Sequence, residues 1–233
     1  YVMTGSSSWF GSDAIDISTS GGNFNARYDG PIDDYLRTIA VGNINGGDYD
    51  DLIMGAHNED AGGSNSGTVY VKFGASSINT LGEQDITAGY DIAYYGKTNT
   101  GYLGYSVTCG DINDNGYDDV IMAASYDDTG GHTNNGSVFV VFGGTGIATG
   151  VQDFATASNY DIMYYGAANY DYLGHAYTNL ATGDVNNDGA QNVLDVVSLV
   201  NCVLAQNCDG GGRIDSATSA EFNVIGNEVT MSA

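Results

Sequence analysis

One nine-residue stretch of the sequence carries an oxygen-bearing side chain at nearly every second position. Between residues 111 and 119, oxygen donors occupy the first, third, fifth and ninth positions, as Asp111, Asn113, Asn115 and Asp119. A tight turn would bring these side chains together, and the backbone of Tyr117 offers a carbonyl oxygen. Hard cations prefer such ligands, so the stretch predicts a calcium site. The alternative is an Asn- and Asp-rich turn without metal.

A second stretch, residues 183–204, matches the spacing of an EF-hand calcium loop. Ligand oxygens fall at positions one, three, five, seven, nine and twelve of this loop: Asp184, Asn186, Asp188, the carbonyl of Ala190, Asn192 and Asp195. Asp replaces the usual Glu at the last position. Apolar residues at helical spacing follow, so the stretch predicts a calcium loop that leads into a short helix. A polar turn that caps a helix without metal is the alternative.

A third stretch, residues 43–51, is a weaker copy of the first. Asn43 and Asn45 occupy the first two ligand positions, Gly47 has replaced the third, and Asp51 keeps the last. Asp48 is a candidate substitute for the missing ligand. Because fewer charges weaken calcium binding, we expect Ca²⁺ at the two other loops and treat this stretch as a third candidate, filled at millimolar calcium.

Two of these loops belong to an internal repeat. SGTVYVKFG (66–74) matches NGSVFVVFG (135–143), and YDIAYYG (90–96) matches YDIMYYG (160–166). The spacing predicts about three units of roughly 69 residues: 1–69, 70–138 and 139–182. Within a unit, apolar residues alternate between clusters of Gly, Asn and Asp, which predicts four short antiparallel strands. Such a small sheet cannot cover both its faces, so neighbouring units are expected to stack.

The run GDINDNGYDDVIMAASYDDTGGHTNNGSVFVVFG, residues 110–143, resembles the FG-GAP repeat of integrin alpha chains, in which a calcium loop precedes a strand. The resemblance extends over residues 1–182 and implies a mostly β fold of four-stranded propeller blades. The family's Gly-Ala-Pro is replaced by Gly-Ala-His at 55–57 and Ala-Ala-Ser at 123–125. Three units do not close the family's seven-bladed ring, so the resemblance implies an open stack, a fragment, or a subunit completed by neighbours.

The last part of the chain differs from the repeats. Residues 183–208 resemble one half of a dockerin, the calcium-dependent plug of cellulosome-type assemblies, and because the usual second half is not found, cohesin binding is not carried over. Residues 209–233 read as a glycine-rich joint and a terminal strand pair around Gly226-Asn227. An isolated strand pair is marginal in water and needs a host sheet, for which a neighbouring copy is one candidate. Head-to-tail contacts between open edges would then generate filaments.

Composition narrows the classes of partner. The chain has 29 acidic residues and five Lys plus Arg, a net charge of −24, which argues against nucleic acid and anionic membrane surfaces as partners. The sequence contains no run of 18 apolar residues, so it does not predict a segment inserted in a membrane. Cys202 and Cys208 stand six residues apart and could form a disulfide, while Cys109 reads as a core thiol. Three reduced thiols are the alternative.

The sequence predicts no enzyme. The histidines, His57, His132 and His175, fall in turns or at strand edges, where we interpret them as loop residues. The acidic pairs at 59–60 and 127–128 would allow a glycosidase-like arrangement, but their repetition favours a structural or calcium role. The tyrosine pairs at 94–95 and 164–165 would suit a sugar site, but cross-strand packing explains them as well.

These observations predict a secreted or cell-surface protein with a calcium-dependent structural or adhesive role. We expect copies to self-associate into a homopolymer, because calcium would neutralise the Asp clusters and lock the turns between strands. One alternative is a propeller module that binds a protein or glycan ligand and does not self-assemble. Another is the non-catalytic part of a carbohydrate-active enzyme, or a piece of another longer multidomain protein.

Overall fold

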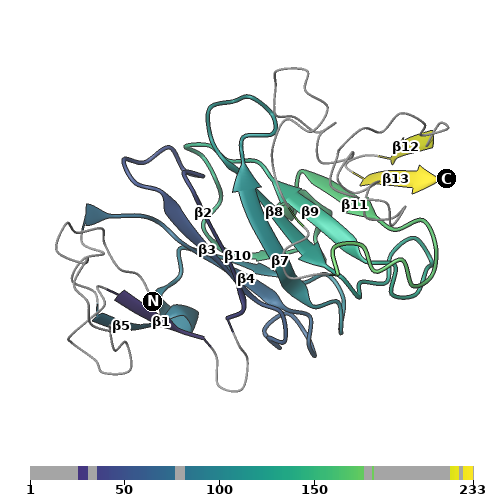
Figure 1. Ribbon diagram of the computed structural model, residues 1–233, viewed down its shortest axis with the longest axis horizontal. Helices are drawn as coiled ribbons and strands as arrows, with labels where there is room; N and C mark the ends of the chain where they lie inside the picture. Colours follow the sequence, from purple (N-terminus) through teal and green to yellow (C-terminus); the bar gives the residue numbers. More distant parts are fainter. Residues whose placement is uncertain are drawn as a thin grey trace, which may run out of the picture.

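The computed structural model describes residues 26–30, 36–76, 82–175 and 180, and the strand residues 221–225 and 228–232. These residues form a mostly β structure in which two main sheets stack face to face (Figure 1). The predicted loop and helix at 183–208 lie outside the described residues, with Cys202 and Cys208. The ligand predictions that fall there are Asp184, Asn186, Asp188, Ala190, Asn192 and Asp195.

Two complete repeats each fold into four antiparallel strands, as the alternating apolar pattern predicts. The first repeat consists of β2 (Thr38–Gly42), β3 (Asp51–Ala56), β4 (Thr68–Lys72) and β6 (Ile92–Tyr95), paired in that order. The second consists of β7 (Leu103–Gly110), β8 (Asp119–Ala124), β9 (Ser137–Val141) and β11 (Ile162–Tyr165). β2 and β7 each lead directly into one of the predicted calcium loops.

A segment from a later part of the chain extends each sheet in parallel. β10 (Gly150–Asp153) follows β9 in the sequence but pairs with β6 of the first repeat. β5 (Gly82–Asp85) pairs in the same way with β1 (Ala26–Asp29). The sequence does not predict these parallel strands, because the segments GEQD and GVQD lack the apolar alternation that marks a strand. Their backbone hydrogen bonds join neighbouring repeats.

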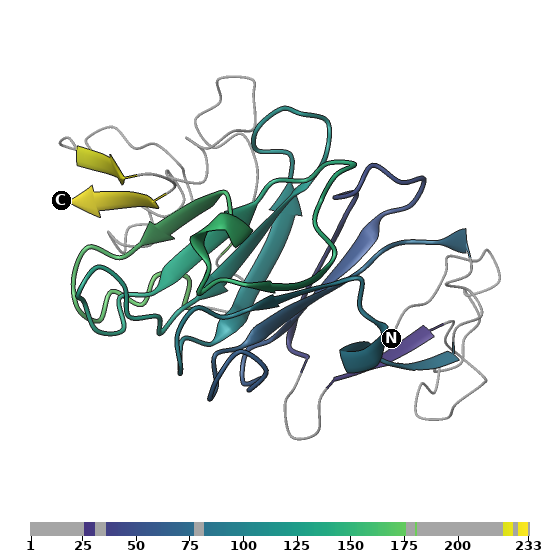
Figure 2. The same ribbon diagram turned by 180° about the vertical axis from the view of Figure 1, so that it is seen from behind.

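The C-terminal strands form the predicted hairpin. β12 (Glu221–Ile225) and β13 (Glu228–Ser232) pair antiparallel, and β13 pairs in parallel with β11. The sheet that hosts the hairpin therefore belongs to the same chain, and not to a neighbouring copy, which was the candidate named from the sequence. β13 takes the place beside β11 that β10 takes beside β6, so the hairpin continues the pattern of parallel extension (Figure 2).

The described helices are short. α1 (Ile86–Gly89) is a single turn, whose start is capped by the Asp85 carboxylate through a 2.9 Å hydrogen bond from the Thr87 N–H. A 3₁₀ turn spans Ala157–Asn159. None of the helices among the described residues has the length and apolar character needed to cross a membrane.

The core lies between the two main sheets. Ile53 and Val71 on the first sheet face Val120 and Met122 on the second, and each of these four side chains is fully buried. The first tyrosine of each repeated pair, Tyr94 or Tyr164, is 1% exposed, as cross-strand packing predicts, whereas Tyr95 and Tyr165 are partly exposed. Cys109 on β7 is half-buried, and burial raises the pKa of its thiol to about 11.

The repeats approach each other closely where β3 meets β7. A Cβ on Gly55 would lie 2.4 Å from the Gly104 carbonyl oxygen and 2.2 Å from Thr38 Oγ1, which itself donates to that oxygen. We expect Gly55→Val to lower the free energy of unfolding by about 2 kcal/mol, because β7 cannot move away without opening the core. Gly146→Ala is the matched control, since a Cβ there meets nothing within 4 Å. Equal urea midpoints for the two variants would contradict this prediction.

Candidate functional site

The 111–119 loop folds around the carboxylate of Asp119, at the start of β8. This side chain is fully buried, and its Oδ2 accepts a hydrogen bond from the Ile112 N–H at 3.0 Å. Its Oδ1 accepts the Gly143 N–H at 2.8 Å and the Asn113 side-chain amide at 3.2 Å. Asp119 therefore ties the loop to the segment that follows β9.

The other predicted ligands turn into the same loop. Asp111 accepts the backbone N–H groups of Asn115 at 3.0 Å and Gly116 at 2.8 Å. Asn113 Oδ1 accepts the Asn115 N–H at 3.1 Å, and Asn115 Oδ1 accepts the Tyr117 N–H at 2.8 Å. The structure thus joins the four predicted side chains in one hydrogen-bonded loop: Asp111, Asn113, Asn115 and Asp119.

The 43–51 loop repeats this arrangement around Asp51. The Asp51 side chain is fully buried, and its Oδ2 accepts the Ile44 N–H at 3.0 Å. Its Oδ1 accepts the Gly74 N–H at 2.9 Å and the Asn45 side-chain amide at 3.2 Å. These are the partners of Asp119 moved back by one repeat, so the two loops share one design.

The 43–51 loop differs at the positions where its sequence is degraded. Gly47 supplies no side-chain oxygen, and its backbone instead binds Asn43 and Asn45 through hydrogen bonds of 2.8 and 2.6 Å. Asp48, the candidate substitute ligand, is exposed and accepts no hydrogen bond from the described residues. The loop network therefore contains one carboxylate, that of Asp51, where the later loop contains two.

The two loops touch across the junction between the repeats. The Asn43 N–H donates to Asp118 Oδ2 at 2.8 Å, and the Asp118 N–H donates to the Asn43 carbonyl at 3.0 Å. A Cβ on Gly46 would lie 2.4 Å from the Tyr117 ring. A change in the conformation of one loop would therefore alter the contacts of the other loop.

Both buried carboxylates lack a positive neighbour: Asp51 and Asp119 form no ion pair with Lys or Arg in the described ranges. Burial raises the pKa of Asp119 to about 6, and the charge of Asp111 adds to this rise. Burial also raises the pKa of Asp51. A bound cation would supply the missing positive charge.

The donor set of the loops fits a hard cation. The later loop combines two carboxylates with two Asn amides, and the earlier loop has one carboxylate with two amides, all of them oxygen ligands that Ca²⁺ accepts. Within the described part of the chain, no three His, Cys, Asp or Glu side chains gather into a group that could hold a metal. A cation in either loop would thus need amide and backbone oxygens as well.

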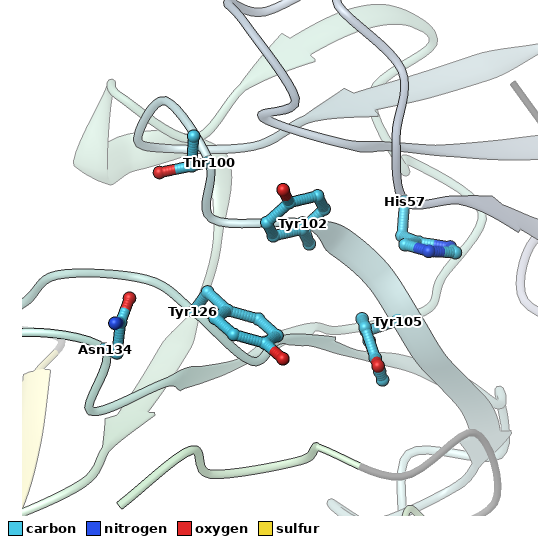
Figure 3. A pocket seen from close by; sticks show the side chains of 6 residues that line it. All are labelled: His57, Thr100, Tyr102, Tyr105, Tyr126 and Asn134. Carbon is cyan, nitrogen blue, oxygen red and sulfur yellow. The ribbon is translucent and has the colours of Figure 1, made fainter. Parts of the chain in front are cut away.

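A pocket of about 410 Å³ lies at the opposite ends of the same strands. β3 ends and β7 begins beside it, and its lining side chains come from both repeats (Figure 3). The lining residues are His57, Thr100, Tyr102, Tyr105, Tyr126 and Asn134. The sequence does not predict this pocket, because its residues come from separate loops. The one available signal, several aromatic residues near the ends of the repeats, is weak.

Comparison with protein families identifies the two complete repeats. The FG-GAP repeat model matches residues 35–71 and 103–141, which hold the first three strands of each repeat. These two segments are FG-GAP repeats. Each contains one of the described candidate loops, and repeats of this kind indicate a propeller-type module and typically occur in extracellular or surface proteins. A search of curated proteins found no match to the chain.

Two of the histidines, His57 and His175, make specific contacts that the loop interpretation does not predict. His57 is 5% exposed and packs edge-on against Tyr105, with ring centroids 5.0 Å apart. Burial, with a contribution from Arg37, lowers the pKa of His57 to about 4. The Nε2 atom of His175 lies 2.8 Å from the Tyr126 hydroxyl.

The acidic pairs in the FG-GAP repeats have structural roles. Asp60 and Asp128 each accept a backbone N–H within their own loop, from Asn65 at 2.5 Å and Asn134 at 2.6 Å. Asp127 is buried and accepts the hydroxyl of Ser137 at 2.6 Å. These contacts agree with the structural alternative for the repeated acidic pairs.

Without calcium, we expect stability to fall as the pH rises from about 4 to 7. Folding raises the pKa of Asp119 from 3.8 to about 6, so the folded state binds more protons between these values. Raising the pH therefore favours unfolding, by about 2 kcal/mol. Asp119→Asn removes this titrating carboxyl and should reduce the slope, while the part that comes from the raised pKa of Asp51 remains. Thermal unfolding in chelator at several pH values measures it, and equal slopes for the two proteins would contradict the prediction.

Proposed function

We propose that this chain is an extracellular, calcium-binding module with a structural or adhesive, non-catalytic role, and that copies of it assemble by stacking their repeats. The contact between the two loops carries the proposal. Because Asn43 and Asp118 join the loops through paired hydrogen bonds, cations bound there would stabilise the junction of the repeats as well as each turn.

The proposed Ca²⁺ sites differ in strength. The 111–119 loop, with two carboxylates in its hydrogen-bonded ligand set, is the tighter site, and the 43–51 loop, with one in that set, needs calcium at extracellular concentrations. The EF-hand-like calcium loop that begins at Asp184 stays a prediction from the sequence. The resemblance of the same segment to half of a dockerin also stays a prediction.

An exposed apolar surface on β2 supports self-association. Ile39 is 62% and Val41 57% exposed on β2, which is the edge strand of the first sheet. Ile39 pairs with Met54 as Val107 pairs with Met122, so Val107 is its equivalent in the next repeat. Val107 is only 7% exposed, because the preceding repeat covers it. We therefore assign the β2 surface to the opposite end of a second copy, in a head-to-tail contact.

Calcium removal tests the proposal. Particle size is followed by light scattering and electron microscopy while a chelator removes calcium and excess calcium is then restored. We expect large assemblies to dissociate with loss of β structure, and to re-form when calcium returns. A compact monomer of equal stability with and without calcium would overturn the proposal.

A second candidate function, ligand binding by a propeller-type module, is favoured by the pocket between the repeats. This function predicts a monomer with a specific ligand, and the scattering experiment separates it from assembly.

A further inference from the structure

The pocket between the FG-GAP repeats has a neutral lining. Its six side chains comprise three tyrosines, a threonine, an asparagine and a histidine, so neither an acidic nor a Lys or Arg side chain lines it. His57 is uncharged at neutral pH, since its pKa is about 4. A ligand held here would meet aromatic rings, hydroxyl groups and an amide rather than a formal charge.

The three tyrosine rings surround one space. Tyr102 and Tyr126 stand edge to face with centroids 5.2 Å apart, and Tyr105 lies 6.1 Å from Tyr126. Figure 3 shows the three rings turned toward the open centre of the pocket. All three side chains are partly exposed, and Tyr105 stacks on His175 with ring centroids 5.2 Å apart, so a ligand would contact the ring surfaces that remain exposed.

The backbone holds these rings in place through unusual local geometry. The pairing of β7 with β8 shifts register between Leu103 and Ser106, a bulge that redirects Tyr105 at the end of the strand. Tyr102 and Thr100 have φ angles of 58° and 59°, which are uncommon for residues other than glycine. Backbone hydrogen bonds to the loop of the first repeat fix both residues. Rings held in this way are preorganised for binding.

The backbone conformation of the loop that carries Thr100 and Tyr102 recurs in the next repeat, but the aromatic lining of the pocket does not recur at the equivalent positions of the two described repeats. Tyr170 and Tyr172, the equivalent residues one repeat later, also have positive φ angles, of 67° and 50°. In contrast, the position of Tyr126 holds Asn58 in the first repeat, and the position of His57 holds Ser125 in the second. Packing of the repeat therefore does not require these two aromatic residues at their positions.

We propose that this pocket binds a neutral saccharide, with the C–H face of a pyranose ring on a tyrosine and its hydroxyls bonded to Thr100, Asn134 and the tyrosine hydroxyls. Aromatic faces beside uncharged donors and acceptors suit a ligand that is apolar on its ring faces and polar at its rim. The volume of about 410 Å³ lies within the range of small-molecule sites. An organic cation would also attract aromatic rings, but the lining holds no carboxylate to balance its charge. This inference goes beyond the proposed structural role.

The test uses saturation-transfer NMR on the full chain in calcium, with a panel of methyl glycosides of neutral hexoses and N-acetylhexosamines, and with tetramethylammonium as the cationic probe. We expect at least one glycoside to bind, and Tyr105→Leu and Tyr126→Leu each to weaken it by about tenfold or more. Tyr170→Leu, which removes a 59% exposed tyrosine outside the lining, is the matched control and should bind as the unmodified chain does.

Tyr105→Phe and Tyr126→Phe keep the rings and test the pocket if loss of a ring unfolds the protein. They should retain binding with about threefold weaker affinity, because only hydroxyl contacts are lost, which for Tyr126 include the contact with His175 Nε2. The proposal fails if no glycoside binds, if tetramethylammonium binds more tightly than every glycoside, or if Tyr170→Leu weakens binding as much as the pocket variants do.

Discussion

Asp111→Asn is expected to lower the calcium affinity of the 111–119 loop by about tenfold or more, which corresponds to roughly 1.4 kcal/mol of binding free energy. The substitution keeps a side-chain oxygen and the size of the residue but removes one of the two carboxylates among the predicted ligands, Asp111 and Asp119. Because charge count sets the affinity of such loops, the variant should resemble the weaker 43–51 loop. Isothermal titration calorimetry measures the affinity, and the rise in melting temperature with added calcium gives an independent measure.

Asp114→Asn is the matched control for this prediction. Asp114 lies in the same loop with the same charge, but it is exposed, and its φ of 58° is one that Asn tolerates. Its substitution removes an equal charge from outside the ligand set. If both variants lose calcium affinity equally, general electrostatic attraction, and not coordination by Asp111, explains the binding. If neither changes, the loop is the metal-free Asx-rich turn.

The local structure of the loops and strands could be predicted from the sequence, because it depends on short-range patterns. Alternating apolar residues marked the four strands of each repeat, and the ligand spacing marked the side chains that cluster around Asp119 and Asp51. The repeat itself strengthened both predictions, since the same spacing occurs twice. Asp48 stays a prediction, because its side chain is exposed and outside the hydrogen-bonded network around Asp51.

The features that could not be predicted from the sequence, the parallel strands and the pocket, depend on contacts between repeats. β10 is a strand only because β6 of the preceding repeat offers an open edge, and its own residues carry no strand pattern. The pocket arises in a similar way, because His57 and Tyr126 come from different repeats. A bulge at Gly104 and Tyr105 completes it, and no local pattern predicts that bulge.

The double substitution Ile39→Lys with Val41→Lys is expected to abolish assembly while leaving calcium binding intact. Both side chains are more than half exposed in the single chain, so the substitution removes apolar contact area that only a partner would bury. Placing two charges in a buried interface without partners costs several kcal/mol, enough to reduce the association constant by about a hundredfold or more. Sedimentation velocity in calcium, across a range of protein concentrations, measures the loss.

The sign of the charge change makes this result informative. The chain has a net charge of −24, so two added lysines reduce the repulsion between copies, and any loss of assembly must come from the β2 surface itself. Tyr170→Lys adds a positive charge at another exposed apolar residue, away from β2, and should assemble normally. If the β2 variant assembles as well as this control, Ile39 and Val41 do not face a second copy, and the stacking of repeats between chains must use a different surface.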